Sequence, residues 1–169
     1  MILVLAVLGV GAGVLFFTSR DRASVSDQAA GPGQGFPDQG HRHLRPGEKP
    51  SAPYSSEPPT SGAHVPVTIR RDATVLSDDE ILQALEQGNV VLLYGSARAP
   101  EALKRLAADL NQGAFTPDLA ASGQAVILGR RAGTRGTVAL AWRHLLRAAA
   151  PQDPALRTFA EAWLGRGPG

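Results

Sequence analysis

The chain of 169 residues contains no cysteine. It therefore forms no disulfide, offers no thiolate nucleophile and supplies no sulfur ligand to a metal. Aromatic residues are scarce, at 5% of the sequence, so the stacking platforms of single-stranded nucleic-acid-binding proteins are not indicated. Lysine occurs only at Lys49 and Lys104. The remaining basic residues are arginines, which suit fixed contacts with carboxylates and phosphates, although a GC-rich genome gives the same bias. We expect no nucleic-acid partner.

Charged side chains are absent from residues 1–17, which form an apolar run. A helix of about 18 residues spans about 27 Å, close to the hydrocarbon thickness of a bilayer. We predict an uncleaved transmembrane anchor at residues 1–19. A cleaved signal peptide is the alternative, but the run has no basic start and no small-residue cleavage site directly after it.

Gly9 and Gly13 within this run form a GxxxG pattern. Small residues at this spacing let a second transmembrane helix approach closely, so we predict that the helix packs against subunits of a larger membrane complex. Frequent glycine in membrane helices is the alternative explanation. Arg20 and Arg22 follow the run, and the positive-inside rule alone would place them in the cytoplasm.

Residues 20–59 are rich in proline, glycine, serine and glutamine and show neither a helical nor a strand period. Such composition is typical of an extended linker. We predict a tether here that lies against partner subunits.

Regular structure is predicted between residues 60 and 169. Ser77 to Glu80 has the pattern of a capping box, and the helix that follows should end near Gln87, before a glycine. Residues 89–95 read NVVLLYG, a short apolar run that predicts a buried strand. A second helix is expected to begin at Pro100, since proline suits the first turn.

Two further strands are predicted at residues 124–129 and 137–142, joined as a hairpin across a polar turn. The turn carries three arginines that we consider candidates for docking partner subunits: Arg130, Arg131 and Arg135.

The chain after Trp142 is expected to be helical and to expose His144. Asp153 and Pro154 then open a final helix as its cap and first residue. The sequence thus predicts an α+β fold with about three strands and packed helices at residues 60–169.

Three segments together resemble a family of bacterial membrane-anchored proteins known as domain of unknown function three-one-zero-five. They read GHRHLRPGE, PYSSEPPTSGAH and ILQALEQGNVVLLY. The resemblance covers roughly residues 38 to 168 and implies an N-terminal membrane helix followed by an exported domain. That implication outweighs Arg20 and Arg22, so we expect the bacterial inner membrane, with the domain on the periplasmic or extracellular side.

The resemblance also implies a set of histidines, matched here by His43 and His64. Two more would lie on the first helix in an H-x-x-E-H pattern, where this chain has Gln83, Glu86 and Gln87. Histidines four residues apart share a helix face and can hold one metal ion, and imidazole sets suit copper or zinc. A glutamine oxygen is a poor ligand for either ion, so the departure removes half of the implied set.

The remaining candidate ligands for copper or zinc are His41, His43, His64 and Glu86. The alternative is a loop histidine that is hydrogen-bonded to backbone. No nucleophile–base pair, paired carboxylates or phosphate-binding loop stands out, so we expect neither an enzyme nor a small-molecule substrate. The predicted function is a non-catalytic, single-helix accessory or structural subunit of a respiratory or photosynthetic membrane complex, without a cofactor. The alternative is a copper- or zinc-handling protein of the cell envelope.

Overall fold

The structure is a computed structural model that describes residues 31–168. The predicted membrane helix at residues 1–19, with Gly9 and Gly13, lies outside these residues. Within residues 31–168, no helix combines the length and the apolar character that crossing a bilayer requires.

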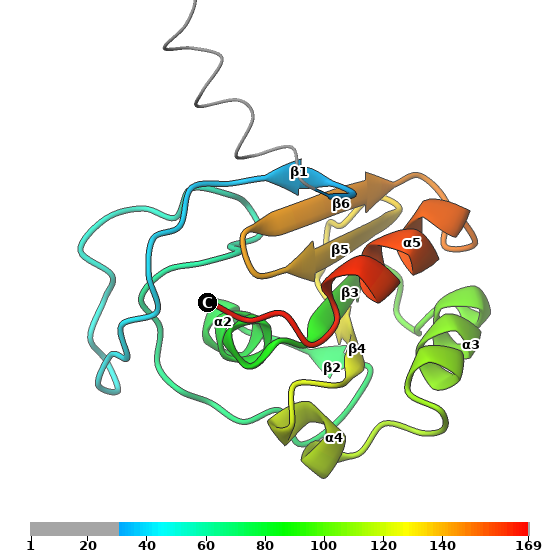
Figure 1. Cartoon of the computed structure of the whole chain (residues 1–169), viewed down its shortest axis with the longest axis horizontal. Helices are drawn as coiled ribbons and strands as arrows, with labels where there is room; N and C mark the ends of the chain where they lie inside the picture. Colours follow the sequence, from blue (N-terminus) through cyan, green and yellow to red (C-terminus); the bar gives the residue numbers. More distant parts are fainter. Residues whose placement is uncertain (1–30, 169) are drawn as a thin grey trace, which may run out of the picture. The chain divides into compact units, whose positions relative to one another are not determined.

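The described residues form one six-stranded sheet with the strand order β1-β6-β5-β3-β4-β2 (Figure 1). Its centre is β3 (Val90–Tyr94), which runs parallel to β4 (Val126–Arg130) and antiparallel to β5 (Thr137–Ala141). All five residues of β3 are buried. This explains its continuous apolar sequence, because a central strand that is covered on both faces has no solvent-facing positions.

The outer strands are short. A tight turn joins β5 to β6 (His144–Ala148), which pairs antiparallel with it. At this edge of the sheet, β6 also pairs with β1 (Gln34–Gly35). At the other edge, β2 (Thr74–Val75) runs parallel to β4.

Helices cover both faces of the sheet, and the alternation of side chains along β3 divides the core between them. Val90 and Leu92 pack in one apolar cluster with residues of α3 and α5, whereas Val91 and Leu93 pack in another with residues of α2 and α4. The helices of residues 31–168 are α2 (Asp78–Gln87), α3 (Glu101–Leu110), α4 (Pro117–Ala121) and α5 (Pro154–Trp163).

The predicted fold class is wrong: the described part is a six-stranded mixed sheet between helices, not a small α+β domain with about three strands. The predicted hairpin of residues 124–129 with 137–142 is also wrong, because β3 lies between β4 and β5. The crossover through α3 and α4 brings β4 back parallel to β3. Short apolar runs predict strands but carry no information about which strands are neighbours.

The predicted helix after Trp142 is instead β6, so His144 lies on a strand. Arg143 adopts a positive φ of 63°, which allows a tight reversal of the chain after β5. Residues 144–148 then pair along the whole of β5. Their leucines and alanine favour helix in isolation, but pairing and burial against the sheet override that local preference.

The prediction of an extended tether is wrong for residues 31–59, because these residues belong to the same compact unit as the rest of the domain. We call residues 31–64 the N-terminal arm. Its start contributes β1, and Leu44 further along is buried.

The start of the arm docks on helix α5. The indole Nε1 of Trp163 donates to the carbonyl of Pro32 at 2.9 Å. Gly33 has φ of 91° and lies so close to Phe159 that a Cβ would sit 2.7 Å from that ring. Glycine here permits close docking of backbone.

Candidate metal centre

Helix α2 supplies one wall of the candidate site, and its local sequence fixes where it begins and ends. The predicted capping box is confirmed: Ser77 Oγ accepts from the Glu80 amide at 3.2 Å, and the Glu80 carboxylate accepts from the Ser77 amide at 2.8 Å. The helix stops at Gly88, whose φ of 102° is left-handed. These two signals fix the helix at ten residues.

One stripe of α2 carries Asp79, Gln83 and Glu86, at positions i, i+4 and i+7 on the face away from the sheet. Both ends of the stripe contact the chain near His64: Asp79 Oδ1 accepts from the Val65 amide at 2.9 Å, and Glu86 Oε2 lies 3.1 Å from His64 Nε2. Gln83 therefore lies beneath the same stretch of chain. Its Oε1 is buried and has no hydrogen-bond partner among the described residues.

The stretch that ends in His64 is a packed turn. Thr60, Ser61 and His64 are all completely buried. The hydroxyl of Tyr54 donates to the carbonyl of Ala63 at 2.9 Å. Dense packing of this kind holds the imidazole of His64 in a single orientation.

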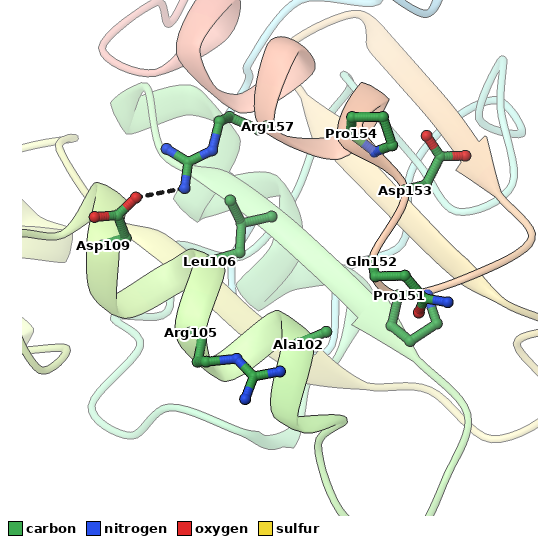
Figure 2. Close-up of a pocket in the computed structure, with 9 residues that line it drawn as sticks. All are labelled: Ala102, Arg105, Leu106, Asp109, Pro151, Gln152, Asp153, Pro154 and Arg157. Atoms are coloured by element: carbon green, nitrogen blue, oxygen red, sulfur yellow. Dashed lines mark hydrogen bonds and ion pairs between the residues drawn. The ribbon is translucent and has the colours of Figure 1, made fainter.

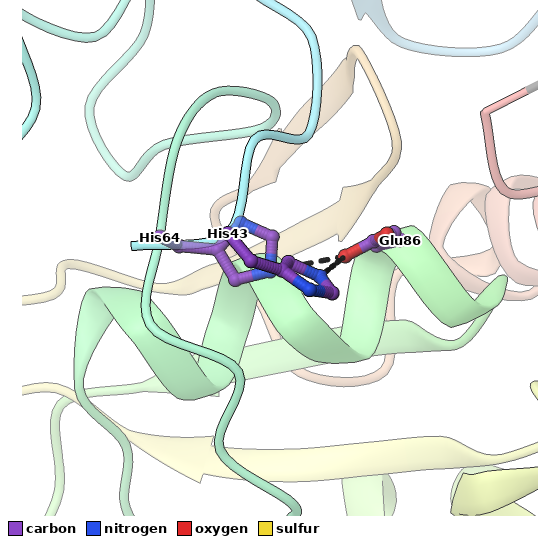
Figure 3. Close-up of side chains that lie close together, drawn as sticks. All are labelled: His43, His64 and Glu86. Carbon is purple, nitrogen blue, oxygen red and sulfur yellow. Dashed lines mark hydrogen bonds and ion pairs between the residues drawn. The ribbon is translucent and has the colours of Figure 1, made fainter. Parts of the chain in front are cut away.

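Two parts of the N-terminal arm bring the two histidines side by side. His43 and His64 form a short parallel bridge, in which the Leu44 amide donates to the His64 carbonyl at 2.8 Å and the His64 amide donates to the Arg42 carbonyl at 3.1 Å. Both rings point to Glu86 in the last turn of α2 (Figure 3). His43 Nε2 lies 3.0 Å from Glu86 Oε2, and the three ligand atoms lie within 4.8 Å of one another.

The hydrogen bonding of His64 fixes which ring nitrogen carries its proton. Nδ1 lies 3.0 Å from the Gly62 carbonyl oxygen, and because a carbonyl only accepts, Nδ1 must donate. In the neutral ring Nε2 then carries only a lone pair, yet it lies 3.1 Å from a Glu86 carboxylate oxygen. Nε2 makes no hydrogen bond to any described residue. Two acceptors so close repel each other, and a cation, either a proton on the imidazole or a bound metal ion, removes this repulsion.

The three side chains fit a metal ion. Zinc binds imidazole nitrogen and carboxylate oxygen at about 2.0–2.2 Å, so two ligands at a tetrahedral angle are about 3.4 Å apart. The separations of 3.0 Å for His43 and 3.1 Å for His64 from Glu86 need to widen by only a few tenths of an ångström, whereas the widest separation in the cluster, up to 4.8 Å, must shorten for all three atoms to bind one ion. A ligating histidine also typically donates its other ring nitrogen to a backbone carbonyl, as His64 does.

Of the four candidate ligands from the sequence, the structure brings together His43, His64 and Glu86. His41 lies outside the cluster, because its ring packs edge-on against Trp142 with 6.2 Å between centroids. The sequence pattern placed Gln83 on the helix but gave no sign that its amide oxygen would be buried without a partner. The donor role of His64 Nδ1 has no sequence signal either, because it depends on the backbone geometry at Gly62.

The three arginines considered for partner docking have different environments. Arg131 is bound within the chain, to Asp78 at 2.6 Å and to the carboxylate of Glu57. Arg130 is half-buried, and its Nε has no partner among the described residues. Arg135 is exposed.

A second feature is an open pocket of about 400 Å³ between α3 and the start of α5 (Figure 2). Arg157 is already bound to Asp109 and Glu161. Asp153 accepts from the Ala155 amide as the cap of α5. Three of the four charged side chains that line the pocket are thus satisfied within the chain, and we place the candidate site at the histidine cluster instead. The pocket is lined by Ala102, Arg105, Leu106, Asp109, Pro151, Gln152, Asp153, Pro154 and Arg157.

Comparison with known proteins gives one match. A family model described as a protein of unknown function, DUF3105, matches residues 47–169. This range includes His64 and Glu86 but not His43. Neither the curated proteins nor the solved structures contain a match.

Proposed function

The chain belongs to the DUF3105 family of proteins of unknown function, and we propose that its domain binds one zinc or copper ion through His43, His64 and Glu86. The observation that carries the proposal is the buried Nε2 of His64, which lies 3.1 Å from a Glu86 carboxylate oxygen but makes no hydrogen bond to any described residue. Burying an unpaired polar atom costs free energy. A bound metal ion removes that cost, because it accepts the lone pairs of both Nε2 and the carboxylate.

The donor set favours zinc or divalent copper. Imidazole and carboxylate are intermediate and hard ligands, and the chain has no cysteine to supply the soft sulfur that monovalent copper prefers. Two histidines and one glutamate also form the protein ligand set of a known class of zinc sites.

We propose that this domain acts in the cell envelope, as a non-catalytic accessory subunit at the bacterial inner membrane. What supports this setting is the uncharged apolar run of residues 1–17. Metal binding then serves to tie the N-terminal arm to helix α2. Purification of the full chain in a mild detergent tests whether it is a subunit of a larger membrane complex. Migration as a free monomer, with no copurifying protein, would count against this proposal.

Metal binding is tested by equilibrium dialysis of the full chain in detergent against zinc or divalent copper, followed by elemental analysis. We expect one ion per chain. His43→Ala should weaken binding more than tenfold, because even outer-shell changes at metal sites cost about 10–100-fold in affinity. The matched control is His41→Ala, which removes another exposed imidazole two residues away but outside the cluster. Equal losses in the two variants, or no stoichiometric metal, would rule the proposal out.

A further inference from the structure

We propose that the metal ion held by His43, His64 and Glu86 keeps an open coordination position that takes a small monoanionic ligand from solvent. This inference rests on the proposed metal site and adds what binds to it. The number of protein ligands is the first support. Among the described residues the cluster holds three ligating side chains. Structural zinc sites are closed by four protein ligands, whereas sites with three leave a position for water or another ligand.

The exposure of the three side chains shows where that position lies. His64 is fully buried, Glu86 keeps 16% of its side-chain surface exposed, and His43 keeps 50%. Exposure therefore rises across the cluster from His64 toward His43. A ligand from solvent reaches the ion from the His43 side without any rearrangement of the buried turn.

The stripe of α2 beneath the His64 turn also carries Gln83, between Asp79 and Glu86. A neutral amide oxygen competes poorly with water or an anion for zinc or copper. The stripe of α2 that carries Glu86 thus has a weak donor at position 83 instead of a fourth strong ligand.

Charge determines the class of ligand. One carboxylate offsets only half of the charge of a divalent ion, and the two imidazoles are neutral ligands. The ion therefore keeps a net positive charge, and a bound metal ion is often the largest local charge in its site. A small monoanion neutralises this charge, whereas a cation or a neutral donor does not.

Cobalt(II) provides the readout, since it replaces zinc in such sites and its visible absorption reports coordination. The full chain in detergent is loaded with cobalt, and sodium azide is then titrated in. We expect a saturable spectral change with a stoichiometry of one azide per bound cobalt. If the cobalt-loaded protein shows no spectral change on addition of azide, the inference is overturned, but the proposed metal site is not. Failure of the chain to bind cobalt at all would overturn both.

A variant that offers a fourth strong ligand beside the cluster gives an independent check. Gln83→His places an imidazole one helical turn from Glu86, on the same stripe. It should raise cobalt affinity and weaken azide binding by about tenfold or more, the scale of ligand effects at metal sites. Gln83→Glu is the second variant, because it adds a ligand of the same length as glutamine.

The matched control is Gln152→His, which adds an exposed histidine in the loop before α5. It should leave both affinities unchanged. Azide binding that is equally strong in Gln83→His, Gln83→Glu and the unmodified chain would contradict the assignment of the open position.

Discussion

His64 Nε2 and Glu86 Oε2 lie 3.1 Å apart, with the imidazole wholly buried and its Nδ1 bound to the Gly62 carbonyl. The two atoms come from a turn and a helix that are well separated along the chain. Without a cation between them the contact is repulsive. This pair is therefore the point at which metal binding should be coupled to the stability of the fold.

The first prediction concerns stabilisation by metal. An ion that binds only the folded chain stabilises it by about 2.7 kcal/mol at a free concentration of about 100 times Kd. We expect zinc to raise the Tm of the full chain. Glu86→Gln should remove most of this rise, because the amide keeps the side-chain shape but is a much weaker ligand. The measurement is thermal unfolding with and without zinc.

His41→Ala is the control for the thermal experiment and should retain the full zinc-induced rise in Tm. A rise of equal size in Glu86→Gln and in the unmodified chain would show that zinc binds elsewhere.

The second prediction concerns the docking of the N-terminal arm. Gly33→Ala should destabilise the fold by about 1–3 kcal/mol, the usual cost of overpacking. The new Cβ would meet the Phe159 ring at 2.7 Å and the Leu145 carbonyl oxygen at 2.9 Å. The effect is measured by chemical denaturation and by the rate of proteolysis within residues 31–59.

Gly47→Ala separates crowding from backbone strain. Gly47 has a similar positive φ of 85°, but a Cβ added there would meet no described atom within 4 Å. The substitution should therefore show only the smaller strain penalty. Equal destabilisation by the two substitutions would mean that the arm does not depend on close packing at Gly33.

The third prediction concerns pH. Burial lowers the pKa of His144 below its usual 6.5, with the nearby Arg143 acting in the same direction and the Trp142 carbonyl acting against it. The unfolded chain then binds more protons than the folded chain near that pH, so this residue's contribution to stability falls as the pH drops through about 6.5. His144→Leu should make the dependence of the unfolding free energy on pH flatter between about pH 7 and about pH 5.

The ring of His144 also stacks on Trp163, with 3.6 Å between centroids, and leucine keeps an apolar contact there. A pH profile of identical slope in the variant and the unmodified chain would exclude His144 as a source of the dependence.

Local signals predicted single elements well. The capping box at Ser77 and the glycine at 88 fixed helix α2, and the apolar run at 90–94 marked the central strand. These features depend on neighbours within a few residues. The pairing of β3 between β4 and β5 depends on a long crossover through two helices, and no periodicity encodes it.

The N-terminal arm was predicted wrongly for a different reason. Its proline and glycine content is typical of linkers, yet here Gly33 permits close contact with α5 and Leu44 is buried. Similarly, the candidate ligands His43, His64 and Glu86 could be named from the sequence, whereas the exclusion of His41 depended on its packing against Trp142. Side-chain direction in a loop is determined by tertiary contacts, which the pattern of residue types does not contain.

The most direct test of the account is a crystal structure of the zinc-loaded chain, with an anomalous difference map measured at the zinc absorption edge. The account predicts one peak, about 2.0–2.2 Å from His43 Nε2, His64 Nε2 and a Glu86 carboxylate oxygen. A structure with no peak between these three side chains, in which a proton links His64 to Glu86 instead, would contradict it.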